Sequence, residues 1–177
     1  MKTRLVVLSD LWGFENSLWI KKYEEILTSD YDLVYYDSRE LAGIDKNIVN
    51  EKEIHLRYIN GGICNAVDKL RESEKNEIDI LSFSIGGTIG WKATMKGLKT
   101  NNLFAISSTR LRKETQKPNC NIHLTFGGND IHRPSKDWAE MIGLTMNIIK
   151  DGGHNIYTQP NVIKSICEEF KNTRTMS

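Results

Sequence analysis

The chain has 177 residues, of which 39% are hydrophobic and 27% are charged, and its formal net charge is +1. This length fits one domain, residues 1–177, that can bury about two-thirds of its unfolded surface. No apolar run approaches the roughly 20 residues that a membrane-spanning helix needs, and residues 1–4 lead into a strand-like run rather than a secretory segment. We therefore expect a cytoplasmic protein with no membrane or nucleic-acid partner.

Six short runs rich in β-branched, aromatic and other apolar residues have little polar alternation, which is typical of strands covered on both faces. They span residues 4–8, 33–36, 78–83, 103–106, 121–126 and 144–149. Apolar residues at helical spacing predict helices around residues 18–27, 59–70 and 89–98, and prolines mark two more, at 134–143 and from 160 onward. Alternating strands and helices predict an α/β fold: three layers around a doubly wound, mostly parallel sheet of about six strands.

Two polar segments are less regular. Residues 37–55 are predicted to form a loop or a short helix, and residues 172–177 are expected to fray at the terminus. Cys64, Cys120 and Cys167 are widely spaced and form no CxxC pair, so we expect small, buried, reduced residues rather than a disulfide or a zinc site. No metal or organic cofactor is expected.

The sequence from Ser82 to Gly87 follows a buried strand and opens into a predicted helix. A sharp turn of this kind lifts a serine hydroxyl clear of the sheet, and Gly86, which lacks a Cβ, lets the turn close. Ser84 is therefore the candidate nucleophile. A serine hydroxyl attacks an acyl group only with a base, an orienting carboxylate and oxyanion donors.

The candidate base is His154, which follows the last predicted strand and so lies at the carboxyl edge of the sheet. The other histidines fit that role less well because they lie in a polar stretch, inside a strand and after the Asp130 loop: His55, His123 and His132.

The candidate acid is Asp130, because the strand before it would deliver its carboxylate beside the His154 loop. Asp151 precedes His154 by only three residues and would more easily serve its own turn. Asp137 lies inside a predicted helix and is expected to face water. The site is thus predicted to combine a serine, an aspartate and a histidine in that chain order.

The loop after the first strand, residues 9–14, ends at the same edge of the sheet as Ser84. One oxyanion N–H is expected from Ile85, directly after the nucleophile, and another from Leu11 or Trp12. An ordinary strand-to-helix turn with Trp12 in the core is the alternative.

Basic residues are concentrated near the candidate nucleophile. Between residues 88 and 117 there are seven lysines and arginines against one acid, Glu114. A solvated helix face with a basic loop would explain them. The functional alternative is an acidic partner or substrate.

The chain resembles the α/β-hydrolase superfamily along nearly its whole length. The residues that carry this resemblance are Ser82–Gly86, Asp130 and His154. The resemblance implies a serine hydrolase with Ser84 as nucleophile, Asp130 as acid, His154 as base, and Ile85 with Leu11 or Trp12 as oxyanion donors. Ser82 replaces the first glycine of the family's elbow, and Asp10 and Leu11 replace its His-Gly pair. The chain is short for this family, as if it lacked two first strands and the cap.

A site without a cap would accept a bulky or tethered substrate. The resemblance then implies a carboxylic ester or thioester, either a small molecule or one presented by an acidic acyl carrier protein. The basic residues that would steer such a carrier are Lys92, Lys96, Arg110 and Arg112.

Two other functions remain open. One is a catalytically silent hydrolase-like domain that binds a small molecule or a protein. The other is a flavin or nucleotide carrier, although the sequence has neither GxGxxG nor GxxxxGK[ST].

Overall fold

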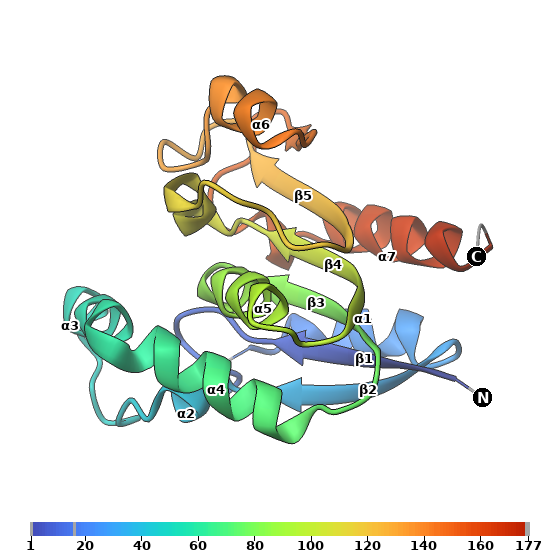
Figure 1. Ribbon diagram of the computed structural model, residues 1–177. Coiled ribbons are helices and arrows are strands. Elements are labelled where there is room, and N and C mark those ends of the chain that lie inside the picture. The colour runs from blue at the N-terminus through green and yellow to red at the C-terminus, as the bar shows by residue number, and fades with distance from the viewer. Residues whose placement is uncertain (1, 16, 176–177) are drawn as a thin grey trace.

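The computed structural model describes residues 2–15 and 17–175. A six-stranded sheet forms its centre, and Figure 1 shows helices packed around this sheet. All five neighbouring pairs are parallel, in the order β2-β1-β3-β4-β5-β6. The predicted fold class is therefore confirmed, and the sheet is wholly rather than mostly parallel. The strands are β1 (Thr3–Leu8), β2 (Tyr31–Tyr36), β3 (Ile78–Phe83), β4 (Thr100–Ile106), β5 (Asn121–Gly127) and β6 (Asn147–Ile149).

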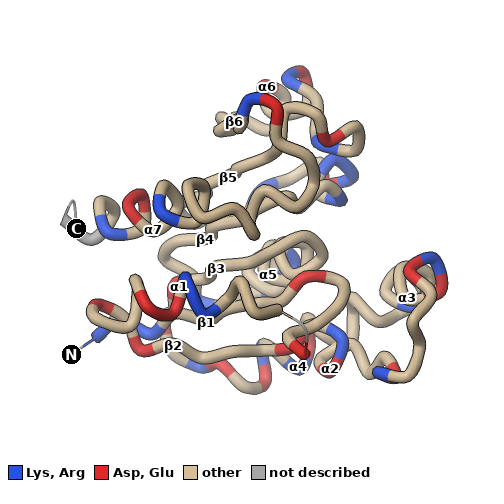
Figure 2. Tube along the Cα trace, turned by 180° about the vertical axis from the view of Figure 1, so that it is seen from behind, with Lys and Arg blue, Asp and Glu red and all other residues tan. Residues whose placement is uncertain are grey.

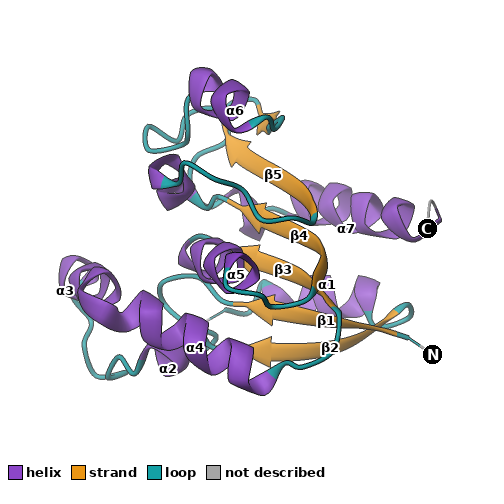
Figure 3. Cartoon of the chain, in the orientation of Figure 1, coloured by secondary structure: helices purple, strands orange, loops and turns teal. Residues whose placement is uncertain are grey.

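Helices cover both faces of the sheet (Figure 3). Buried side chains form two clusters, one on each face. The first face carries α2 (Ser38–Ala42), α4 (Ile63–Ser73), α5 (Ile85–Met95) and α6 (Lys136–Ile142). The second face carries α1 (Ile20–Leu27), the 3₁₀ turn η3 (Ile156–Thr158) and α7 (Pro160–Thr175). Strand β3 is buried along its whole length, as expected for a central strand between two helical layers.

The polar segment after β2 is more helical than the sequence indicates. It contains α2 and a second helix, α3 (Glu51–Arg57), which continues through the π-helical turn η1 (Tyr58–Gly62) into α4. Asn60 and Gly61 interrupt the helical geometry there, with φ of 117° at Gly61. In Figure 1, α3 lies beyond the carboxyl ends of the strands. Figure 2 shows charges of both signs on α3, which explains its weak apolar periodicity.

Several smaller expectations differ from the structure. Strand β6 begins at Asn147, because Leu144 and Met146 pack against the first cluster instead of pairing with β5. Helix α7 extends to Thr175 where fraying was expected, and residues 176–177 lie outside the described residues. All three cysteines are free, but only Cys167 is buried; Cys120 is partly exposed and Cys64 is exposed.

Glu74 ties the first two strands to the end of α4. Its carboxylate accepts hydrogen bonds from Arg4 Nε at 2.8 Å, Arg4 Nη2 at 2.9 Å and the Tyr36 hydroxyl at 2.6 Å. Burial opposes the charge of this side chain, but the bonds from Arg4 and Tyr36 outweigh it and lower the pKa of Glu74. The ionised form is therefore the one that stabilises the fold.

We expect Glu74→Gln to lower the free energy of unfolding at pH 7 by about 1–3 kcal/mol, because it loses charge-assisted hydrogen bonds. The contribution of the carboxylate is present above its unfolded pKa and is lost as the pH falls through its lowered folded pKa. Urea unfolding at several pH values should show the gap between the two proteins closing in acid. A gap that stays constant with pH would contradict this account.

No helix among the described residues is long and apolar enough to span a bilayer.

Candidate active site

Ser84 lies in a strained turn between β3 and α5. Its φ is 49° and its ψ is −116°, a backbone conformation that residues with a side chain rarely adopt. The turn is held because the Ser84 N–H donates to the Ile106 carbonyl at 2.8 Å and the Ser84 carbonyl accepts from the Gly87 N–H at 3.1 Å. This geometry is that of a nucleophile elbow.

Gly86 and Ser82 show how the turn fits the sheet. A Cβ on Gly86 would lie 2.6 Å from the Ser9 carbonyl oxygen and 2.9 Å from that of Leu8, so only glycine allows this approach of α5 to β1. Ser82, which stands where the resemblance has a glycine, is fully buried and donates its hydroxyl to the Phe104 carbonyl at 2.7 Å. The serine is therefore accommodated inside the sheet and does not crowd the turn.

We expect Gly86→Ala to lower the turnover of any substrate of Ser84 by about 100-fold, because the new methyl group meets backbone atoms and must displace the elbow. Gly153→Ala is the matched control, since a Cβ there meets nothing within 4 Å. Comparing kcat for the two variants, with circular dichroism to check folding, tests this. Equal effects of the two substitutions would show that the close approach at Gly86 is unimportant.

The loops that follow β5 and β6 are joined through their backbones. The Gly128 N–H donates to the Ile149 carbonyl at 2.9 Å, and the Asn129 N–H donates to the Gly152 carbonyl at 2.8 Å. Gly127 packs so closely that a Cβ there would lie 2.2 Å from the Gly153 carbonyl oxygen. These contacts bring the segment that carries Asp130 against the segment that carries His154.

Ser84, His154 and Asp130 form one hydrogen-bonded chain. The Ser84 Oγ lies 3.0 Å from His154 Nε2, and His154 Nδ1 lies 2.7 Å from Asp130 Oδ2. Asp130 Oδ1 also accepts the His132 N–H at 3.0 Å. The Asp130 side chain is 3% exposed and that of His154 is 39% exposed. A carboxylate bound to Nδ1–H leaves Nε2 free to accept the serine proton.

The competing candidates lie elsewhere. His123 is bound through Nδ1 to Glu169 at 2.8 Å and stacks on Phe104, while the side chains of His55 and His132 are exposed. Asp137 is exposed on α6, as expected. Asp151 is exposed in its own turn, at a φ of 60°.

The structure reduces the number of backbone N–H groups that could act as oxyanion donors. Ile85 is the first residue of α5, and the first N–H groups of a helix have no partner within it. The Trp12 N–H already donates to Asp10 Oδ1 at 2.9 Å, so Leu11 stays the candidate donor from the β1 loop. The Trp12 side chain is 46% exposed, so it is not part of the core.

Two residues near the site were not predicted from the sequence. Tyr157 donates its hydroxyl to Asp10 Oδ2 at 3.0 Å and so connects the β1 loop to the segment after His154. Burial raises the pKa of Asp10, although the bonds from Trp12 and Tyr157 partly offset it. Ser107, at a φ of 52°, donates its hydroxyl to the His154 carbonyl at 2.6 Å. Ser107 could have been predicted to lie at the carboxyl edge of the sheet, because it directly follows the buried strand β4.

Trp91 and Trp138 are part of the buried core. Trp91 is fully buried and donates its indole N–H to the Gln116 carbonyl at 3.2 Å. Trp138 is 7% exposed and donates to the Glu114 carbonyl at 2.9 Å.

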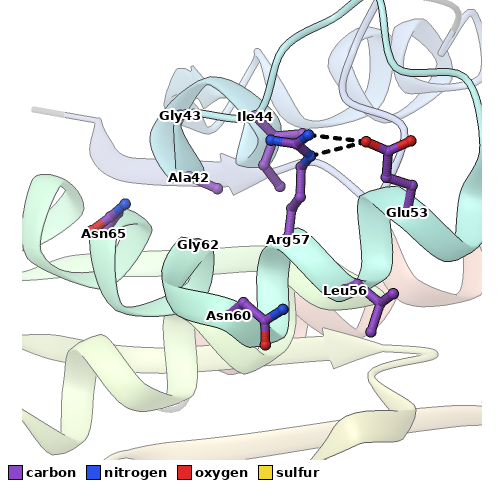
Figure 4. Close-up of a pocket in the computed structure, with 9 residues that line it drawn as sticks. All are labelled: Ala42, Gly43, Ile44, Glu53, Leu56, Arg57, Asn60, Gly62 and Asn65. Carbon is purple, nitrogen blue, oxygen red and sulfur yellow. Dashed lines mark hydrogen bonds and ion pairs between the residues drawn. The ribbon is translucent and has the colours of Figure 1, made fainter.

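A cavity of about 430 Å³ lies where α2 meets α3 and α4 (Figure 4). The Arg57 guanidinium reaches back one turn to the Glu53 carboxylate, with Nη2 2.9 Å from Oε1, and this exposed ion pair stands at its wall. Neither Ser84 nor His154 lines the cavity. Within the described residues, no group of three or more histidines, cysteines or acids is placed to hold a metal ion.

The fold and the hydrogen-bonded chain together define the class: the protein has the α/β-hydrolase fold. Among solved structures, mouse alpha/beta hydrolase domain-containing protein 10 is similar with a TM-score of 0.72 at 14% identity, over 98% of this chain and 90% of that one. An α/β-hydrolase enzyme from a lagoon-sediment metagenome of Mar Chica, Morocco, gives a TM-score of 0.68 at 16% identity, over 99% and 93%.

Est1E of Butyrivibrio proteoclasticus, in a structure with ferulic acid bound, gives a TM-score of 0.66 at 12% identity, over 99% of this chain and 90% of that one. No family model and no curated protein matches the sequence. At these identities the comparisons establish the fold.

Proposed function

We propose that this protein is a serine hydrolase that cleaves a carboxylic ester or thioester through an acyl-enzyme intermediate. The observation that carries the proposal is the chain of two hydrogen bonds, of 3.0 Å and 2.7 Å, from Ser84 through His154 to Asp130. The solved structures of similar fold support it, since they include an α/β-hydrolase enzyme and a dienelactone hydrolase-like phosphotriesterase.

In the first step, Ser84 Oγ attacks the carbonyl carbon while His154 Nε2 takes its proton. The negative charge that develops on the carbonyl oxygen is stabilised by the N–H groups of Ile85 and Leu11 and by the N-terminus of α5. Asp130 holds the imidazole and stabilises its protonated form. The tetrahedral intermediate then collapses, and His154 returns the proton to the departing alkoxide or thiolate.

In the second step, a water molecule gives a proton to His154 and attacks the acyl carbon. Collapse of this intermediate returns the proton to Ser84 Oγ and releases the carboxylic acid. His154 is suited to both steps because its side chain is 39% exposed, whereas Asp130 is shielded from water.

A fluorophosphonate probe tests the proposal directly, because it reacts with an activated serine and not with a serine that lacks a base. We expect labelling of the native chain, with the adduct found on Ser84 by peptide mass spectrometry. Heat-denatured protein should not react. A folded chain that stays unlabelled would instead be a silent hydrolase-like binding domain.

A further inference from the structure

A groove of about 410 Å³ follows the outer side of α5, between α4 and the segment after the 3₁₀ turn η2 (Thr109–Lys113). Its apolar part consists of Ile59, Ile63 and Val67 on one side and Met95 on the other. Ile59 is 41% exposed and Met95 is 42% exposed. Ile63 and Val67 are buried in the core, so the apolar surface that the groove exposes to water comes from Ile59 and Met95.

Cations line the same groove. Lys92 lies on α5, Lys96 follows it by four residues as the C-cap of that helix, and Arg110 comes from η2. Lys92 Nζ lies 2.8 Å from Glu114 Oε1, and Lys96 Nζ lies 3.3 Å from Asp68 Oδ1; both are pairs with partly exposed side chains, which exchange partners at little cost. Among the described residues, Arg110 has no carboxylate within ion-pair distance. Three of the four basic residues singled out in the sequence thus face one groove.

The groove lining carries three cations, Lys92, Lys96 and Arg110, against one acid, Glu114. Burial lowers the pKa of His55, and the charges of Arg110 and Arg112 lower it further, so both guanidinium groups act on the space near α3. Positive potential over a surface with apolar side chains favours a partner that is both acidic and amphipathic.

We propose that this groove docks an acidic, amphipathic helix of an acyl carrier protein that delivers a thioester to Ser84. A helix lays its apolar face into such a groove and can place carboxylates at i and i+4 beside the row of Lys92 and Lys96. A small molecule with a single carboxylate would pair with only one of these cations, so the row of cations favours a partner with several carboxylates. The proposal rests on the proposed function and names the partner that brings its substrate.

The groove lies within reach of the nucleophile. Helix α5 begins directly after Ser84, and Lys92 follows Ile85 by seven residues, about 10 Å along the helix axis. At the other wall, Arg110 follows Ser107 by three residues, and Ser107 contacts the His154 carbonyl. A carrier seated here would hold a flexible acyl tether near His154, whose side chain is 39% exposed.

The test compares two substrates: octanoyl-loaded acyl carrier protein and p-nitrophenyl butyrate. The groove variant is Lys96→Glu with Arg110→Glu. The matched control is Lys21→Glu with Lys164→Glu, which makes the same charge change on α1 and α7 at the opposite face of the sheet. At low ionic strength we expect the groove variant to lose at least about tenfold in kcat/KM for the carrier substrate and the control to lose much less. Turnover of the small ester should be unchanged in both.

Equal losses in the two variants, or no loss in the groove variant, would overturn the docking site. The docking site would also be overturned if free octanoate bound in the groove and the groove variant kept its kcat/KM for the carrier substrate. The occupant of the groove would then be a small amphiphile.

Binding of the unloaded carrier, measured by calorimetry, separates this proposal from the hydrolase activity. Wild-type protein that cleaves the small ester but does not bind the carrier would refute docking alone. Groove-dependent binding by a protein that cleaves neither substrate would refute the activity and leave docking standing.

Discussion

Ser84→Ala is expected to reduce kcat for a short p-nitrophenyl ester by a factor of about 10⁴ or more, because no other hydroxyl lies in hydrogen-bond contact with His154 Nε2 among the described residues. The fold should survive the change. The serine hydroxyl makes no contact that the core needs. Alanine removes only this hydroxyl group and keeps the Cβ at the strained backbone position. Initial rates and the thermal unfolding midpoint measure the two effects.

Ser82→Ala serves as the control for this experiment. Ser82 lies two residues away and has the same hydroxyl, but it is buried and bound to the Phe104 carbonyl. We expect that variant to keep most of its activity while losing about 1 kcal/mol of stability. Comparable turnover by Ser84→Ala and wild type would exclude the acyl-enzyme mechanism.

Asp130→Asn is expected to lower kcat by a factor of about 10⁴ with little change in the fold. An amide has nearly the shape of the carboxylate, so it still accepts the His132 N–H. Its NH₂ group, however, would donate to His154 Nδ1 and force the proton onto Nε2. The imidazole would then be unable to accept the proton of Ser84. Steady-state kinetics across a range of pH tests this.

Asp151→Asn is the matched control, because it makes the same chemical change three residues before His154. Asp151 is exposed and has a positive φ, which asparagine tolerates well. We expect nearly full activity. If this variant lost more activity than Asp130→Asn, the triad acid would have been assigned to the wrong aspartate.

Most of the fold could be predicted because the local signals agree. Buried strands such as β3 are mostly apolar, and the parallel arrangement follows from their alternation with helices. The predicted helices and strands differ from the structure where tertiary contacts override local composition. Strand β6 is short because Leu144 and Met146 are used in packing, and α3 is invisible to apolar periodicity because only Ile54 among its residues is buried.

The candidate site shows the same division. Ser84 and His154 were found from turn chemistry and from their place after a strand, because parallel strands bring their carboxyl ends to one edge. The contact of Asp130 rather than Asp151 with His154 depends on the packing of Gly127 and Asn129 onto the His154 loop. Tyr157, which fixes Asp10 from 147 residues away, has no local signal at all.

The sequence by itself determined the order of strands and helices, the sharp turn at Ser84 and the identity of the groups that reach the carboxyl edge, because each depends on neighbours within a few residues. Only the tertiary structure decided which carboxylate meets the imidazole, which N–H of the β1 loop is left free, and that Lys92, Lys96 and Arg110 share one groove. Those outcomes depend on distances between segments far apart in the chain, and such distances are set by packing rather than by local preference.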